Sequence, residues 1–208
     1  MRKTNYLGMI LVVILVALPV MATAAAASSI RTQMALKQAM RSFNKSPKAL
    51  EPEAITVEVA HADTFLVGHR GPELTAFMDP NCIWCHRFYE KALPLIHAGK
   101  LHLRVVLVGF LKPTSAAKAA AVLMARHPAQ ALALDESRFN VVTEEGGIHP
   151  ASAAPASIRE SVHHNTQILI HTGEEATPTL LYLNKQNHWE LQHGLGRYGL
   201  KKIMAWIR

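Results

Sequence analysis

Cysteine is scarce in this chain of 208 residues: the only two stand three positions apart, as Cys82 and Cys85. A structural zinc site needs four ligands and most catalytic sites need three, so two sulfurs exclude a zinc site built from cysteine alone. Histidines would have to complete it. The twelve histidines are scattered, and none has the spacing of a zinc ligand pair, not even the adjacent His163 and His164. We therefore expect no metal site.

The chain also lacks a run of basic residues with interleaved aromatic residues, although its formal net charge is +7. A basic stripe is the usual sign of a nucleic-acid-binding surface, so nucleic acid is not an expected partner. Charged residues make up 18% of the chain and hydrophobic residues 50%. This balance is typical of a chain that folds around an apolar core, and the length fits one domain with additional segments.

The N-terminus has the pattern of a secretory signal peptide. Arg2 and Lys3 precede a long apolar run, and small residues follow as far as Ala27. A positive start, an apolar stretch and small residues at the cleavage point are typical of such a segment, so we expect residues 1–27 to be removed, with cleavage after Ala24 or Ala27. The alternative is an uncleaved membrane anchor, because the apolar stretch approaches the length that spans a bilayer. A signal of this kind places the folded part outside the cytosol, where disulfides persist.

A short N-terminal part separates this signal from the compact domain. Residues 28–43 follow the pattern of an amphipathic helix, and residues 44–53 have the composition of a linker. Residues 54–60 alternate between apolar and polar side chains, which predicts a strand. We expect this part to cover residues 28–72 and the compact domain to cover residues 73–208.

The compact domain begins with the pattern of a strand, a helix and a second strand. Residues 73–79 are a short apolar run, Pro80 and Asn81 interrupt it, and residues 82–97 fit a helix. Residues 101–110 contain a continuous apolar core rich in β-branched side chains, which predicts a strand buried on both faces. Strand, helix and strand in this order form a βαβ unit, whose two strands run parallel.

The rest of the chain predicts a helical block, a β-hairpin and a final helix. The helical block covers about residues 114–172, and the hairpin has its turn at residues 184–187. The order β-α-β, helical block, β-β-α is the layout of a thioredoxin-like α/β domain that carries an inserted helical block. This is the fold class that we expect.

The two cysteines fit a redox dithiol. If a helix begins at Cys82, its free N–H groups and the positive end of its dipole stabilise a thiolate there, and thiols in such motifs have pKa values between roughly 3.5 and 7.5. One helical turn brings Cys85 next to Cys82, but in a more buried position. We expect an exposed Cys82 to attack and Cys85 to resolve the mixed disulfide. Trp84 either offers an apolar rim to an unfolded substrate or packs against its neighbours.

Two other interpretations of the motif stay open. Because His86 follows Cys85, the sequence Cys-Ile-Trp-Cys-His also fits the attachment of a c-type haem, although cytochrome c domains are mostly helical. His86 would then be an axial ligand, whereas in the dithiol it is a first-turn side chain whose imidazolium would stabilise the Cys82 thiolate. In the second alternative the protein is a non-enzymatic chaperone or assembly factor, and the two cysteines form only a structural disulfide.

A second feature supports the dithiol. Thr177 and Pro178 stand just before the apolar run of residues 179–183, and proline is permitted as the first residue of a strand. Thioredoxin-like folds place a cis-proline here, facing the active-site cysteines. A cis bond would expose the backbone of Thr177 to an extended substrate segment. The sequence leaves an ordinary trans bond open as the alternative.

Four stretches resemble the DsbC/DsbG group of periplasmic thiol:disulfide interchange proteins, and its DsbG members more closely. They are residues 77–88 (FMDPNCIWCHRF), 103–123, 177–183 and 194–204, and the resemblance covers about residues 73–208.

This resemblance implies roles for the residues of the motifs. Cys82 is the attacking thiol, Cys85 the resolving thiol, and Thr177-Pro178 the cis-proline loop. The implied activity is the rearrangement or reduction of disulfides in exported proteins of the periplasm, with a membrane thiol-disulfide electron donor that keeps the protein reduced. We expect no cofactor.

Two departures from the family pattern leave points open. Ile83-Trp84 stands where this group carries Pro-Tyr or Gly-Tyr, so the sequence does not fix the direction of electron flow.

Family members also carry a dimerisation domain and a linker helix, and residues 28–72 are too few for both. The resemblance implies a homodimer and this length argues against one. A monomer would act more as a reductase or oxidase, and any membrane contact would be through an uncleaved signal segment.

Overall fold

The computed structural model describes residues 32–35, 37, 49–197 and 199–208. The chain divides into two units, Met1–Ser46 and Pro47–Arg208. Of the helix predicted over residues 28–43, residues 32–35 and 37 are helical and the others lie outside the described residues, as does the predicted signal peptide. Within the described ranges, no helix combines the length and the apolar character needed to cross a bilayer.

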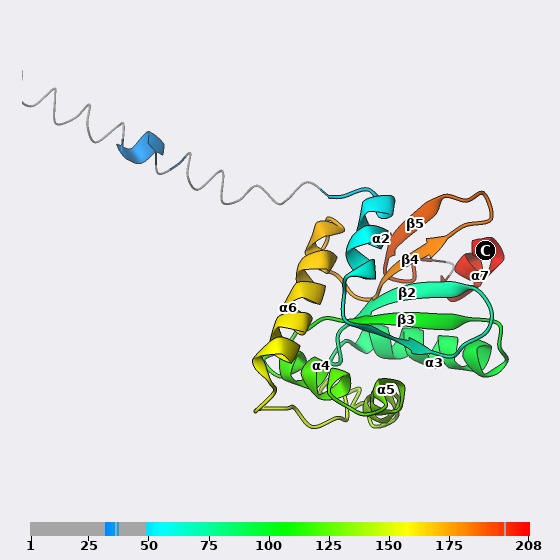
Figure 1. Cartoon of the computed structure of the whole chain (residues 1–208), viewed down its shortest axis with the longest axis horizontal. Coiled ribbons are helices and arrows are strands. Elements are labelled where there is room, and N and C mark those ends of the chain that lie inside the picture. The colour runs from blue at the N-terminus through cyan, green and yellow to red at the C-terminus, as the bar shows by residue number, and fades with distance from the viewer. Residues whose placement is uncertain (1–31, 36, 38–48, 198) are drawn as a thin grey trace, which may run out of the picture. The chain divides into compact units, whose positions relative to one another are not determined.

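The second unit is built on a mixed five-stranded sheet with the strand order β1-β3-β2-β4-β5 (Figure 1). The strands are β1 (Thr64–Val67), β2 (Glu73–Met78), β3 (His102–Leu107), β4 (Thr179–Leu183) and β5 (Trp189–His193). β2 and β3 run parallel, and each of the other neighbouring pairs runs antiparallel. β4 and β5 form the predicted hairpin.

The predicted βαβ unit is confirmed. β2 leads into α3 (Ile83–His97), and α3 leads into β3, whose Leu103 lies opposite Leu74 of β2. Gly99 ends the helix with a positive φ of 65°, a conformation that glycine adopts without steric cost. The buried side of α3 comprises Cys85, Phe88, Tyr89, Ala92 and Ile96.

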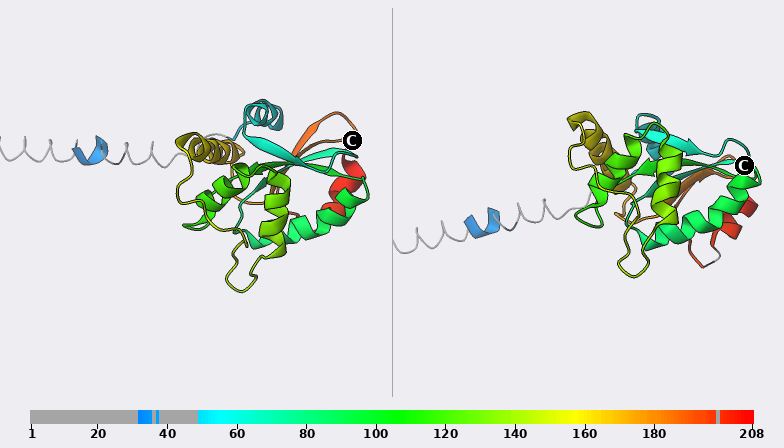
Figure 2. Two further views of the ribbon diagram at one scale, coloured as in Figure 1. Left: turned by 60° about the horizontal axis from the view of Figure 1, so that its bottom comes forward. Right: turned by 90° about the horizontal axis from the view of Figure 1, so that it is seen from below.

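The core lies on both faces of the sheet, as the continuous apolar run within residues 101–110 predicts. Leu103 and Leu107 belong to the larger apolar cluster, which includes α3 and α7 (Gly199–Trp206), while Val106 belongs to a second cluster on the other face. Successive residues of a strand point to opposite faces, so β3 contributes to both. Figure 2 shows α3 and the N-terminal helix of this unit on opposite sides of the sheet.

The predicted helical insert is also confirmed. Three helices lie between β3 and β4, namely α4 (Ser115–Leu123), α5 (Pro128–Ser137) and α6 (Ala156–His171). α6 contributes Ile168 and Leu169 to the second apolar cluster. Ser115 of α4 contacts Asp79 directly after β2, and Glu136 of α5 contacts His86 in the first turn of α3, so both helices stand beside the two cysteines.

The strand predicted over residues 54–60 is wrong, because these residues belong to the helix α2 (Pro52–Ala60). Pro52 stands in its first turn, where a missing N–H group is tolerated. Ile55 and Val59 are buried, while Val57 between them is 62% exposed. An alternating pattern also contains pairs four residues apart, and such pairs share one face of a helix. The sequence pattern alone therefore fits either structure.

β1 is a strand that the sequence reading missed. It has four residues, pairs with the edge of β3 and is followed by Gly68 and Gly71, which have φ values of 84° and 83°. Such a short run between turn residues gives a weak pattern. β1 is an edge strand of the sheet, and α2 adds Ile55 and Val59 to the second apolar cluster, so both elements belong to the unit Pro47–Arg208.

Substitutions in α2 separate its helical packing from the strand pattern. We expect Ile55→Ala to lower the free energy of unfolding by about 2–5 kcal/mol, because it removes a fully buried side chain. Val57→Ala is the control, and its effect should stay within about 0.5 kcal/mol because the side chain is exposed. Denaturant unfolding measures both. Equal losses in the two variants would contradict the helix, since in a strand both side chains face the core.

Candidate active site at the start of helix α3

The end of β2 sets the position of Cys82. After Met78 the chain turns through Asp79, Pro80 and Asn81, and the N–H of Cys82 donates to the carbonyl of Asp79 at 3.0 Å. Cys82 is the N-cap of α3: its backbone is extended, with φ −92° and ψ 111°, and its Sγ accepts the N–H of Cys85 at 3.2 Å. A side-chain acceptor at this position takes up an otherwise free N–H group of the first turn. The sulfur itself therefore caps the helix.

Both cysteines are buried, whereas the sequence predicts an exposed Cys82 and a buried Cys85. Cys82 is only 4% exposed and Cys85 is fully buried. The prediction of an exposed Cys82 is wrong because the loop before β4 lies against it. The Sγ of Cys82 donates to the carbonyl oxygen of Thr177 at 3.4 Å, and the bond between Thr177 and Pro178 is cis. The structure thus brings together the two motifs that the sequence singles out.

The two thiols have opposite pKa shifts. The hydrogen bond from the Cys85 side chain lowers the pKa of Cys82 to about 7, and the N–H groups of Cys85 and Trp84 add to this effect against the opposing effect of burial. Burial raises the pKa of Cys85 well above its usual value, and the contact with the Cys82 sulfur raises it further. Near neutral pH the Cys82 sulfur is therefore about half ionised, while Cys85 keeps its proton.

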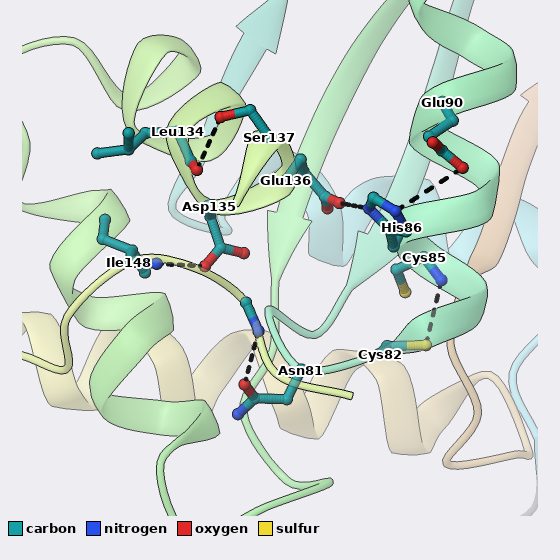
Figure 3. Close-up of polar contacts among 11 residues, drawn as sticks. Asn81, Cys82, Cys85, His86, Glu90, Leu134, Asp135, Glu136, Ser137 and Ile148 are labelled. Atoms are coloured by element: carbon teal, nitrogen blue, oxygen red, sulfur yellow. Dashed lines mark hydrogen bonds and ion pairs between the residues drawn. The ribbon is translucent and has the colours of Figure 1, made fainter. Parts of the chain in front are cut away.

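His86 contacts carboxylates instead of Cys82. Its Nδ1 lies 2.9 Å from Oε2 of the buried Glu136 in α5, and its Nε2 lies 3.7 Å from Glu90 (Figure 3). The ring stacks on Phe139 with a centroid distance of 4.5 Å. Burial raises the pKa of Glu136 well above its usual value, with further contributions from Asp135, Cys82 and Glu90. The insert thus places an acidic group within electrostatic reach of the Cys82 sulfur.

A buried carboxylate fixes the turn before Cys82. Asp79 is fully buried, and its Oδ1 accepts the N–H of Asn81 at 2.9 Å and the hydroxyl of Ser115 at 2.7 Å. Its Oδ2 accepts the N–H groups of Phe110 and Leu111 at 2.9 and 3.1 Å. Four donors compensate the desolvation of the carboxylate. Asp79 therefore ties the turn to the segment after β3 and to the start of α4.

Asn81 connects the same turn to the rest of the insert. Its Oδ1 accepts hydrogen bonds from the buried ammonium group of Lys118 at 2.9 Å and from the N–H of Gly146 at 3.2 Å. A Cβ on Gly146 would overlap the Asp135 carboxylate and the Pro80 carbonyl, so the position fits only glycine. The sequence reading did not identify Asp79, Lys118, Asp135 or Glu136. The position of Asp79 directly before the motif was the one local signal for any of them.

Only one of the two carboxylate oxygens of Asp135, which lies beside this network, has a hydrogen-bond partner among the described residues. Its Oδ1 accepts the N–H of Ile148 at 3.0 Å, while its Oδ2 is buried and makes no hydrogen bond within the described part of the chain. Burial raises the pKa of Asp135 to about 6, against the effects of the Ile148 hydrogen bond and the Lys118 charge.

The residues predicted to bind substrate line one cavity beside the cysteines. Trp84, Thr177 and Pro178 share a cavity of about 570 Å³, and Trp84 is 60% exposed. Trp84 therefore forms a rim and is not packed in the core. Within the described residues, no group of three or more His, Cys, Asp or Glu side chains is arranged to hold a metal ion. His163 and His164 lie on α6.

Two curated relatives are similar to this chain in sequence. They are the thiol:disulfide interchange proteins DsbG of Pseudomonas aeruginosa, 36% identical over 118 residues, and of Escherichia coli, 32% identical over 125 residues. The matched segments cover 57% and 58% of this chain but 44% and 46% of the relatives, so the chain spans less than half their length. No family model matches the chain. The predicted resemblance to the DsbC/DsbG group is confirmed.

Solved structures confirm the predicted fold. Proteus mirabilis ScsC in a compact conformation superposes with a TM-score of 0.59 at 15% identity, over 90% of this chain and 93% of that one. A periplasmic thioredoxin-like protein from Salmonella enterica serovar Typhimurium gives a TM-score of 0.54 at 19% identity, over 76% of this chain and 96% of that one. The domain is thioredoxin-like, with an inserted helical block.

The opposite pKa shifts of the two thiols predict their titration. We expect the reduced protein to show one thiolate step at about 7, measured by ultraviolet thiolate absorbance between about pH 4 and 10. Cys82→Ser should abolish this step. Cys85→Ala should move it to higher pH, because it removes the side chain whose hydrogen bond lowers the pKa of Cys82 most. An ionisation in the usual range for a free thiol, about 8.5, would contradict the assignment.

The raised pKa of Asp135 predicts that the protein loses stability as the pH rises. Its folded-state pKa of about 6 lies above its unfolded value, so its burial has no cost below about pH 4 and a growing cost as the pH rises through 6. Between about pH 4 and 7 we expect the wild type to lose roughly 1–3 kcal/mol more of its free energy of unfolding than Asp135→Asn. Urea unfolding at a series of pH values measures the difference. Parallel curves would rule out the shifted carboxyl group.

Proposed function

We propose that this chain is a periplasmic thiol:disulfide oxidoreductase that reduces or rearranges disulfides of exported proteins through a mixed disulfide at Cys82. The observation that carries the proposal is the geometry at the start of α3, where the Cys82 sulfur accepts the N–H of Cys85 and lies against the Thr177 carbonyl. The lowered pKa of Cys82 and the raised pKa of Cys85 support the same roles. The similarity to thiol:disulfide interchange proteins supports the same reaction class.

In the proposed reaction, the Cys82 thiolate attacks one sulfur of a substrate disulfide. A bond forms between Cys82 and that sulfur, the substrate bond breaks, and the second substrate sulfur leaves as a thiolate. Cys85 then loses its proton and attacks Cys82. This step releases the first substrate sulfur as a thiolate and forms the disulfide between Cys82 and Cys85, so two electrons pass from the protein to the substrate.

The same mixed disulfide permits rearrangement. If another substrate thiolate attacks the substrate sulfur before Cys85 attacks the Cys82 sulfur, the substrate leaves with a new disulfide and Cys82 returns as a thiolate. Net reduction requires a donor that restores the dithiol, and we assign this role to a membrane thiol-disulfide electron donor. We expect Trp84, Thr177 and Pro178 to hold the substrate segment, because they line the cavity beside the cysteines.

The geometry argues against both other interpretations of the motif. A c-type haem needs both sulfurs accessible for its thioether bonds, whereas Cys82 is 4% exposed, Cys85 is fully buried and the His86 ring stacks on Phe139. A purely structural disulfide needs no thiolate, whereas the hydrogen bonds at the start of α3 lower the pKa of Cys82 to about 7. This lowered pKa fits an attacking thiol.

Cysteine variants test the proposal. We expect the wild type to reduce insulin and to restore scrambled ribonuclease, and Cys82→Ser to do neither. Cys85→Ser should accumulate a covalent complex with the substrate that a small reducing thiol releases, because the resolving step is missing. Non-reducing electrophoresis detects the complex. If Cys82→Ser keeps full activity in both assays, the chain is not this enzyme. The same holds if the wild type shows neither activity and suppresses aggregation as well as a variant without cysteines does.

A further inference from the structure

The cavity beside the cysteines is a groove between three parts of the fold. Trp84, Arg87 and Lys91 line it from α3, the loop that ends at Pro178 lines it from a second side, and residues 193–197 after β5 line it from a third. A second cavity of about 470 Å³ shares Lys91 and Gly199 with it. The two cavities therefore adjoin along α3 toward α7, as a track whose length suits an extended segment.

The groove carries an excess of positive charge that its own side chains do not neutralise. Arg87, Lys91 and Arg197 are exposed along it, and Glu174 is the one acidic residue in its lining. Within the described part of the chain, none of these three cations forms an ion pair. The Arg87 guanidinium lies 4.7 Å from the centre of the Trp84 ring. Stacking on a ring leaves the N–H groups at its edge available.

The other polar side chains of the lining, those of Thr177 and His193, carry no negative charge that would offset these cations. The Nδ1 of His193 lies 2.8 Å from the hydroxyl of Thr179, so this nitrogen faces the sheet and not a ligand. Along the second cavity Lys201 adds another cation, and the other lining residues there are uncharged. The positive charge therefore extends over the whole track.

We propose that this groove selects extended protein segments that carry acidic residues beside the reacting cysteine. Unpaired cations in a concave wall attract anions and raise their association rate, and guanidinium groups bind carboxylates through paired hydrogen bonds. The exposed Trp84 ring gives such a segment an apolar surface next to the attacking sulfur. This inference rests on the proposed function and adds the substrate class.

Matched peptides test the inference. Short peptides with one cysteine, blocked as a disulfide with 2-mercaptoethanol, are made with glutamate, glutamine or lysine on both sides of that cysteine. The Cys85→Ser protein is mixed with each, and mass spectrometry of quenched samples follows the protein–peptide disulfide as 2-mercaptoethanol is released. Each rate is divided by the rate of the same peptide with dithiothreitol, which removes the intrinsic effect of the flanking charges.

We expect the glutamate peptide to react about tenfold faster than the lysine peptide at low ionic strength, with the glutamine peptide between them. The ratio should fall toward one at about 1 M salt, where the Debye length is about 3 Å. The combined variant Arg87→Glu, Lys91→Glu and Arg197→Glu should invert the order. Because the salt series uses unaltered groove residues, it tests the inference even if this variant does not fold.

A second combined variant is the charge-matched control. Lys100→Glu, Arg126→Glu and Arg138→Glu change the net charge by the same amount at exposed positions outside the groove, and this variant should keep the order of the unaltered groove. If all three peptides react at the same normalised rate, the groove does not select acidic segments, although the oxidoreductase proposal stands. If no peptide forms a disulfide with the protein, the proposed function itself fails.

Discussion

The buried carboxylate of Asp79 is the constraint on which the site depends. It accepts hydrogen bonds from the turn before Cys82, from the segment after β3 and from the start of α4. A buried charge is tolerated only when donors surround it, so these three segments must keep their positions together. The N-cap geometry of Cys82 follows from this, because the turn delivers the cysteine to the first position of α3.

The inserted helices contribute side chains to the network around the two cysteines. α4 supplies Ser115 and Lys118 to the turn, and α5 supplies Glu136 to His86. These contacts join residues that are far apart in the sequence. The insert thus holds the first turn of α3 from one side, while the loop that contains Thr177 and Pro178 holds the Cys82 sulfur from another.

The sequence was sufficient for the elements whose signals are local. The apolar run of β2, the break at Pro80 and the cysteine spacing predict the start of α3, and Thr177-Pro178 predicts the facing loop. It was insufficient for α2, because the spacing of Ile55 and Val59 fits both a helix and a strand. It also missed Lys118, Asp135 and Glu136. These charged residues lie on helices where charge usually marks a solvated face, and only the packing of the insert against the turn buries them.

Because the Cys82 sulfur caps α3, it affects the equilibrium between the dithiol and the disulfide of Cys82 and Cys85. The Sγ of Cys82 accepts the N–H of Cys85 while it is a thiol or thiolate, and closing a disulfide removes the negative charge that this N–H and the helix dipole favour. Each contact that stabilises the thiolate therefore weakens the disulfide relative to the dithiol, which is how a strong oxidant of this chemistry obtains its potential. Because the pKa of Cys82 is about 7, near the value of the corresponding thiol in thioredoxin, this effect on the disulfide is modest and the dithiol can still pass electrons to a substrate.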